Sequence, residues 1–157
     1  MAELDLAVHL RTTTAWAYNN LVNDLNALDE DTASNSADEA TRPAIKMVAE
    51  CGSVNSLLAS LVATGEAARP TPEQREAFFA AIKTRADALR TLEEGTQKLY
   101  AAIDGVAPDS WSNMVTTPFG PWTRARAASL AAQHMMYHDG QLNSIHLQHG
   151  DTEMHWQ

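Results

Sequence analysis

Residues 121–150 read PWTRARAASLAAQHMMYHDGQLNSIHLQHG, and this stretch predicts the long helix from which the fold can be worked out. Pro121 suits the first turn of a helix, where its missing N–H costs nothing, and Gly150 is a typical stop. Between them, apolar residues recur at helical spacing and form one stripe, which includes Ala127, Leu130, Leu142 and Ile145. The pattern predicts an amphipathic helix from near Pro121 to about His149.

Polar side chains interrupt the middle of this apolar stripe, at His134, His138 and Gln141. The remaining polar residues of the segment, Gln133, Asp139 and Asn143, are expected on a solvated face. Histidines four residues apart are neighbours on a helix surface and can bind one metal ion together. The alternative is a pair of hydrogen-bonded, partly buried histidines, and the spacing alone does not separate the two.

The other histidines near the C-terminal end are not expected to join that pair. His149 lies eleven residues beyond His138, which is about 16 Å along a helix axis. His146 and His155, like His149, are expected on the surface or in the tail. Trp156 suggests that the tail docks on the bundle.

The rest of the chain shows the same helical periodicity, over residues 4–28, 43–62 and 72–105. The sequence Thr71-Pro72-Glu73-Gln74 is a typical start signal for the last of these segments. Residues 29–41 and 106–121 are rich in small residues, proline or glycine, and are expected to be connections without regular structure. Four amphipathic helices predict an all-α four-helix bundle, formed as a single domain over residues 1–157.

One acidic residue falls inside the apolar face of the second predicted helix. Glu50 lies between apolar positions of that face, and a buried carboxylate needs a partner. Lys46, one turn earlier, is one candidate partner; a metal ion shared with His134 and His138 is the other. Cys51 lies on the same face, where an interior cysteine usually behaves as a small hydrophobic residue.

Composition narrows the class of protein without indicating a reaction. The formal net charge of −9 disfavours a nucleic-acid partner, because that binding depends on clustered Lys and Arg. A single cysteine fits a reducing cytoplasm, and the sequence shows neither a signal peptide nor an apolar run typical of a membrane span. A cytoplasmic protein without membrane association is therefore expected.

The run His134-Met-Met-Tyr-His138-Asp-Gly140-Gln141-Leu resembles the last-helix signature of the DinB/YfiT-like superfamily, and Thr117-Pro118-Phe119-Gly120 resembles the loop that enters that helix. The resemblance implies an up-down-down-up four-helix bundle with a divalent metal, zinc or nickel, at one end. Family members usually bind it through two histidines of the last helix, matched here by His134 and His138, and one of the second. Glu50 takes the place of that second-helix histidine, with Cys51 beside it.

A metal held by Glu50, His134 and His138 would suit a metal-dependent hydrolase or a thiol-dependent transferase, acting on a small-molecule substrate or with a low-molecular-weight thiol. Gln141 would orient an imidazole or a ligand, and Phe119 would wall the pocket. The alternative is a non-catalytic bundle with a degenerate metal site, which binds a ligand or a partner. A homodimer formed through an apolar helix face is a further possibility.

Overall fold

The computed structural model describes residues 5–36, 41–67 and 69–156, and it is mostly helical, as the sequence predicts. The four long helices are α1 (Leu6–Ala27), α3 (Ala44–Thr64), α5 (Arg85–Asp104) and α6 (Arg124–Gln148). Shorter elements lie between them: α2 (Glu30–Ser34), α4 (Pro72–Ala81), a 3-10 turn (Pro108–Ser110) and the strands β1 (Met114–Thr117) and β2 (Gly120–Thr123).

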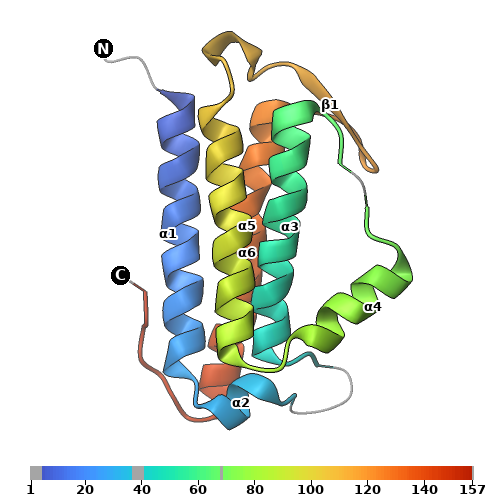
Figure 1. Ribbon diagram of the computed structural model, residues 1–157. Helices are drawn as coiled ribbons and strands as arrows, with labels where there is room; N and C mark the ends of the chain where they lie inside the picture. The colour runs from blue at the N-terminus through green and yellow to red at the C-terminus, as the bar shows by residue number, and fades with distance from the viewer. Residues whose placement is uncertain (1–4, 37–40, 68, 157) are drawn as a thin grey trace.

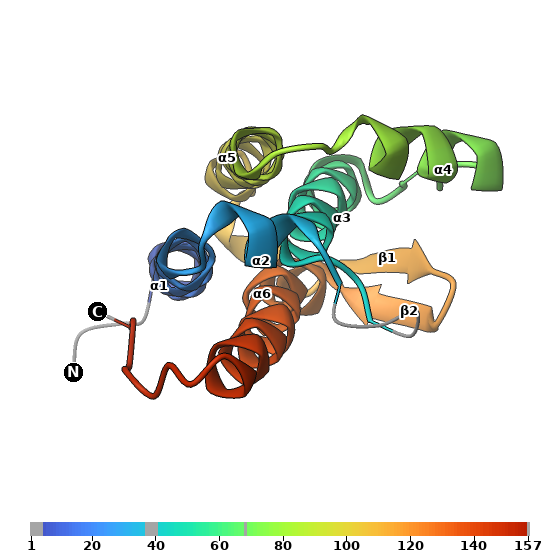
Figure 2. The same cartoon turned by 90° about the horizontal axis from the view of Figure 1, so that it is seen from below.

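The long helices lie side by side and form the body of the molecule (Figures 1 and 2). In Figure 1, α1 and α6 run toward the lower end, whereas α3 and α5 run toward the upper end. Helix α3 packs against both α5 and α6, and α6 also packs against α1. Seen from below, α4 and the two strands lie outside this group, beyond α3 and α6 (Figure 2).

The helix predicted over residues 72–105 is broken into two in the structure. Helix α4 begins as expected, with Thr71 and Gln74 forming a capping box, but it ends at Ala81. Ile82 is buried, and Thr84 caps a new helix through a second capping box with Asp87. The periodicity of the two helices is similar, so the expectation of one helix missed a Thr-x-x-Asp start signal inside the segment.

The connection before α6 also differs from the prediction, because it contains a β-hairpin. Strands β1 and β2 pair antiparallel, with Val115 opposite Trp122 and Thr117 opposite Gly120. Helix α6 then begins at Arg124, capped by Thr123, rather than near Pro121. Each strand has only four residues, which is too short for an alternation of apolar and polar residues to stand out in the sequence.

The core has two apolar layers separated by a polar one. The lower layer includes Leu21, Leu25 and Leu92, and the upper layer includes Leu58, Leu99 and Trp111. Between these positions along α3 and α5, the buried Asn55 donates a hydrogen bond to Thr96 Oγ1 at 3.0 Å.

Helix α3 is long and apolar enough to cross a membrane by length and composition, which was not expected from the sequence. However, 56% of its most apolar window is buried inside the structure, between α5 and α6. The central helix of a globular bundle has the same composition, so this feature is explained by core packing.

Candidate metal centre

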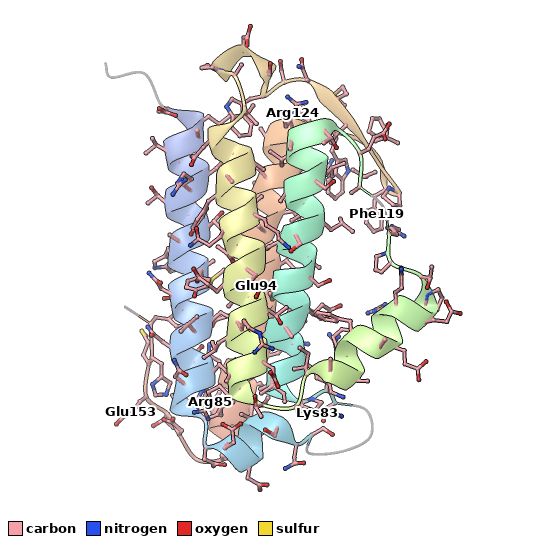
Figure 3. The ribbon with its side chains drawn as sticks, viewed as in Figure 1. Lys83, Arg85, Glu94, Phe119, Arg124 and Glu153 are labelled. Atoms are coloured by element: carbon pink, nitrogen blue, oxygen red, sulfur yellow. The ribbon has the colours of Figure 1, made fainter. Side chains whose placement is uncertain are left out.

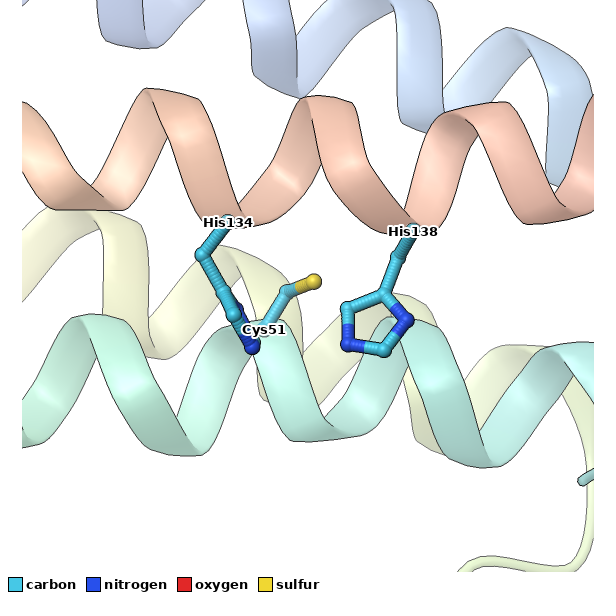
Figure 4. Close-up of side chains that lie close together, drawn as sticks. All are labelled: Cys51, His134 and His138. Carbon is cyan, nitrogen blue, oxygen red and sulfur yellow. The ribbon is translucent and has the colours of Figure 1, made fainter.

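His134 and His138 extend from α6 toward α3, where Cys51 lies between them (Figure 4). One potential ligand atom from each of these residues lies within 4.8 Å of the other two. The two imidazole rings are 4.7 Å apart, nearly perpendicular to each other. The structure therefore brings together the histidine pair expected from the sequence, and adds Cys51, for which the sequence favoured packing as a small hydrophobic residue over metal binding.

Gln141 sets the orientation of His138. The Nδ1–H group of His138 donates to Gln141 Oε1 at 2.7 Å, because a carbonyl oxygen can only accept. In the neutral ring this leaves a lone pair on Nε2, which faces α3. The expected contact between Gln141 and an imidazole of the pair is thus present, one helical turn from His138, and it leaves Nε2 as the atom free to bind a cation.

His134 has a buried nitrogen, Nδ1, without a hydrogen-bond partner among the described residues. Burial, and then the neighbouring His138, lowers the pKa of His134 to about 4. Burial also lowers the pKa of His138, offset in part by its hydrogen bond to Gln141. Both rings are therefore held in the neutral form that binds metals, and the unpartnered nitrogen of His134 is suited to a ligand.

Glu50 lies at the edge of this cluster, with its carboxylate 3.6 Å from His138 Nε2. It is paired with Arg42, and its other oxygen is 3.3 Å from Arg75. The carboxylate that the sequence places on an apolar face is thus balanced by two arginines, one before α3 and one in α4, whereas the sequence suggested Lys46 or a metal ion as its partner. Its side chain is 18% exposed, so Glu50 lies at the boundary between the core and solvent.

Cys51 is fully buried, and its thiol belongs to the lower apolar layer of the core. Burial, followed by the negative charge of Glu50, raises the pKa of Cys51 well above its usual range. The thiol is therefore protonated and unreactive in the cation-free protein. A bound divalent metal would reverse this, because a coordinated thiol loses its proton.

A cavity of about 400 Å³ lies between α2, the start of α3 and the second half of α6. Most of its lining residues are polar. Cys51, His134 and His138 do not line it, and it meets the cluster through Gln141 and Arg42, which bind His138 and Glu50. The expected contribution of Phe119 is not seen among the described lining residues. Phe119 lies at the tip of the hairpin, 76% exposed and stacked on Trp122 (Figure 3).

The opposite side of α6 corrects two expectations. Asp139, predicted on a solvated face, is fully buried, and so is His146. The reason is that α6 packs against α1 as well as α3, and inside that interface the side-chain amide of Asn143 on α6 donates a hydrogen bond to the carboxylate of Asp24 on α1. Burial, and then the neighbouring carboxylate of Asp24, raises the pKa of Asp139 to about 8.

Comparisons with known proteins agree with this architecture. A family model described as the DinB superfamily matches residues 13–142, while no match was found among curated proteins. Similar solved structures include a mycothiol-dependent maleylpyruvate isomerase, 20% identical with a TM-score of 0.69, and its histidine-to-alanine variant, 18% identical with a TM-score of 0.69. Each alignment covers 88% of this chain and 61% of the other, so the chain spans less than two thirds of those enzymes, and the likeness concerns the fold.

Proposed function

The chain belongs to the DinB superfamily, and from this premise we propose that it is a metal-dependent enzyme that uses a low-molecular-weight thiol on a small polar substrate. The observation that carries the proposal is the pair of neutral histidines that face α3, His138 buried and His134 partly buried, with a cavity that reaches this pair through Gln141. The family resemblance read from the last helix and the match of the family model support the same site.

In this proposal His134 and His138 are two of the ligands, and α3 supplies the third. The geometry favours Cys51, whose thiol is grouped with both imidazoles. Glu50, the residue expected from the sequence, is the alternative ligand: it lies 3.6 Å from His138 Nε2, but it would have to give up contacts with Arg42 and Arg75. Zinc and nickel both accept imidazole with either a thiolate or a carboxylate.

A divalent metal at this position would lower the pKa of a bound thiol or water toward neutrality. The chain's own residues would orient the ligands and receive the substrate. Gln141 holds His138 with Nε2 directed at the site, and Arg42 and Arg75 keep a positive charge near Glu50 at the cavity edge. The polar cavity next to Gln141 would receive the substrate, and the buried core around Cys51 excludes water from the other side.

A thiol reaction is favoured over hydrolysis by the fold, because the similar solved structures are of an enzyme whose name states dependence on mycothiol. The reducing cytoplasm proposed from the single cysteine would supply such a thiol. A metal-dependent hydrolase with the same ligands remains the second candidate, and the experiment below separates the two.

Metal content tests the ligand set. We expect His134→Ala and His138→Ala each to bind one equivalent of zinc fewer than the wild type, measured by elemental analysis after dialysis against zinc. Two variants of α3 identify the third ligand. Cys51→Ser should lose that equivalent of zinc if Cys51 is the ligand, and Glu50→Gln should lose it if Glu50 is the ligand. The exposed His149, changed to Gln, is the matched control and should change nothing.

Cobalt substitution tests the thiol step. In the cobalt-loaded wild type, a low-molecular-weight thiol should strengthen the thiolate-to-cobalt absorption band, and His134→Ala should show no such change. A band that added thiol leaves unchanged would favour the hydrolase. Unchanged zinc content in both histidine variants would instead mean that the bundle is non-catalytic and that its histidines form a hydrogen-bonded polar cluster.

A further inference from the structure

A second cluster of potential metal ligands lies where α6 ends. It consists of His146, Asp151 and His155, which we call the tail cluster, and one ligand atom from each lies within 4.8 Å of the others. Asp151 Oδ2 is 3.1 Å from His146 Nδ1 and 2.9 Å from His155 Nε2. The imidazole rings of the two histidines are 4.7 Å apart. None of these residues belongs to the site formed by Cys51, His134 and His138.

The turn that ends α6 brings the residues of the tail cluster together. Gly150 has a φ of 82°, a left-handed conformation that side chains disfavour, and it turns the chain back on α6. The Asp151 N–H donates to the His146 carbonyl and the Gly150 N–H to the Leu147 carbonyl, which is the Schellman arrangement. Asp151 is therefore held over His146 by backbone hydrogen bonds, not by its own side chain alone.

The tail beyond Asp151 is fixed in two further ways. The Glu153 N–H donates to Asp151 Oδ1 at 2.9 Å, which orients the carboxylate. Trp156 packs edge-on against Trp16 of α1, with ring centres 5.8 Å apart. Between these anchors, His155 is carried back toward Asp151, so the docking expected from Trp156 also assembles the cluster.

The hydrogen bonds of His146 favour a cation between its Nδ1 atom and the carboxylate of Asp151. Its Nε2–H donates to the Asp24 carbonyl at 2.9 Å, because that oxygen can only accept. In a neutral ring, Nδ1 would then direct a lone pair at Asp151 Oδ2, an arrangement that is repulsive without a positive charge between them. The His146 side chain is 3% exposed, so water screens this contact poorly. A cation at this position would be bound by both His146 Nδ1 and Asp151 Oδ2.

We propose that the tail cluster is a separate binding site for a zinc-like divalent cation, which fastens the C-terminal tail to α1 and α6. Two imidazoles and one carboxylate form a donor set that zinc accepts, with a position left open for water. The hydrogen bond from His146 to a backbone carbonyl is the outer contact that metal-binding histidines almost always make. The carboxylate of Asp151 is already charged at neutral pH, because hydrogen bonds from Glu153 and His155 lower its pKa.

Zinc binding to the full chain tests this site. Isothermal titration should find two equivalents in the wild type and one in His155→Gln and in Asp151→Asn. His149→Gln removes an exposed histidine of the same region and should keep both equivalents. His134→Ala should lose only the equivalent at the first site, so the tail site can be present even if the proposed function fails.

Hydrogen exchange supplies a second readout. Zinc should slow the exchange of amides 151–156 by at least roughly tenfold in His134→Ala, and it should leave them unchanged in His155→Gln. Both tail variants should keep the wild-type melting temperature in chelator, which would show that they fold. The proposal is overturned if His155→Gln and Asp151→Asn still bind as much zinc as the wild type, or if zinc leaves the tail amides unprotected. In that case the cluster is held by its hydrogen bonds alone.

Discussion

Glu50 and Cys51 are neighbours in α3, but they have different surroundings and therefore different chemistry. A helix turns by about 100° per residue, so Glu50 and Cys51 face different surroundings. Glu50 meets Arg42 and Arg75 at the edge of the bundle, while Cys51 lies in the core beside His134 and His138. The same carboxylate raises the pKa of the thiol, so the two residues are coupled, although only the thiol is grouped with both histidines.

Tyr18 on α1 provides a residue whose ionisation should limit stability at high pH. Its hydroxyl donates to Glu93 of α5 at 2.5 Å. Burial, then the hydrogen bond and charge of Glu93, and finally Tyr100, raise its pKa well above the usual 10. The folded protein keeps this proton where the unfolded chain releases it, so the contribution is complete below pH 10 and is lost as the pH rises further.

We therefore expect the free energy of unfolding to fall above pH 10 in the wild type and to fall less steeply in Tyr18→Phe. Urea unfolding between pH 8 and 11 measures this, with chelator present throughout. Tyr137→Phe, at an exposed position, is the control and should follow the wild-type curve. Equal slopes for Tyr18→Phe and the wild type would contradict the expectation.

At the scale of elements, the contact of α3 with α5 depends on two glycines that face each other. A Cβ atom on Gly95 would lie 2.0 Å from the Gly52 carbonyl oxygen, and one on Gly52 would lie 2.2 Å from the Thr91 carbonyl oxygen. Both obstacles are backbone atoms, which cannot rotate away. The close approach packs α5 against the side of α3 that faces away from α6, on the helix that carries Cys51 of the candidate metal centre.

We expect Gly95→Ala to lower the free energy of unfolding by about 3 kcal/mol, at the upper end of the effect of overpacking. Gly140→Ala is the matched control, because Gly140 also lies inside a helix but a Cβ there meets nothing within 4 Å. That variant should gain roughly 0.5–1 kcal/mol from helix propensity. Urea unfolding of both variants measures the difference, and a Gly95→Ala protein as stable as the wild type would disprove the close packing.

For the whole molecule, the proposed cation sites lie on different helix interfaces: one between α3 and α6, the other where the tail meets α1 and α6. A cation that binds only the folded chain stabilises it by mass action. At 100 times its dissociation constant, zinc should contribute about 2.7 kcal/mol per site. For a chain of this size, each kcal/mol corresponds to roughly 2–4 °C in the melting temperature.

Zinc should therefore raise the melting temperature of the chelated wild type by roughly 5–10 °C per occupied site. His134→Ala and His155→Gln should each lose part of this shift, and the double variant should lose all of it. Differential scanning calorimetry with and without zinc measures these shifts. If zinc still raises the melting temperature of the double variant, the ion binds at a different position.

The mostly helical fold, the family and the histidine pair could be read from the sequence, because these depend on local periodicity and on residues four positions apart along one helix. The sequence also predicted the nearby Gln141 and the start signal at Thr71, but it missed α2 and the break between α4 and α5. Signals read on a single helix cannot reveal a second helix that covers its polar side. Asp139 and His146 were therefore expected in solvent, although α1 buries them.

The residues of other segments that meet these histidines are set by how the helices pack together. Cys51 joins the pair and Arg42 and Arg75 meet Glu50 because α3, α4 and α6 pack together, which no spacing within one segment encodes. Likewise, Gly150 turns the tail so that His155 returns to His146, nine residues earlier in the chain. Local spacing fixes which side chains share a face, whereas contacts between segments follow from how the helices close around a common core.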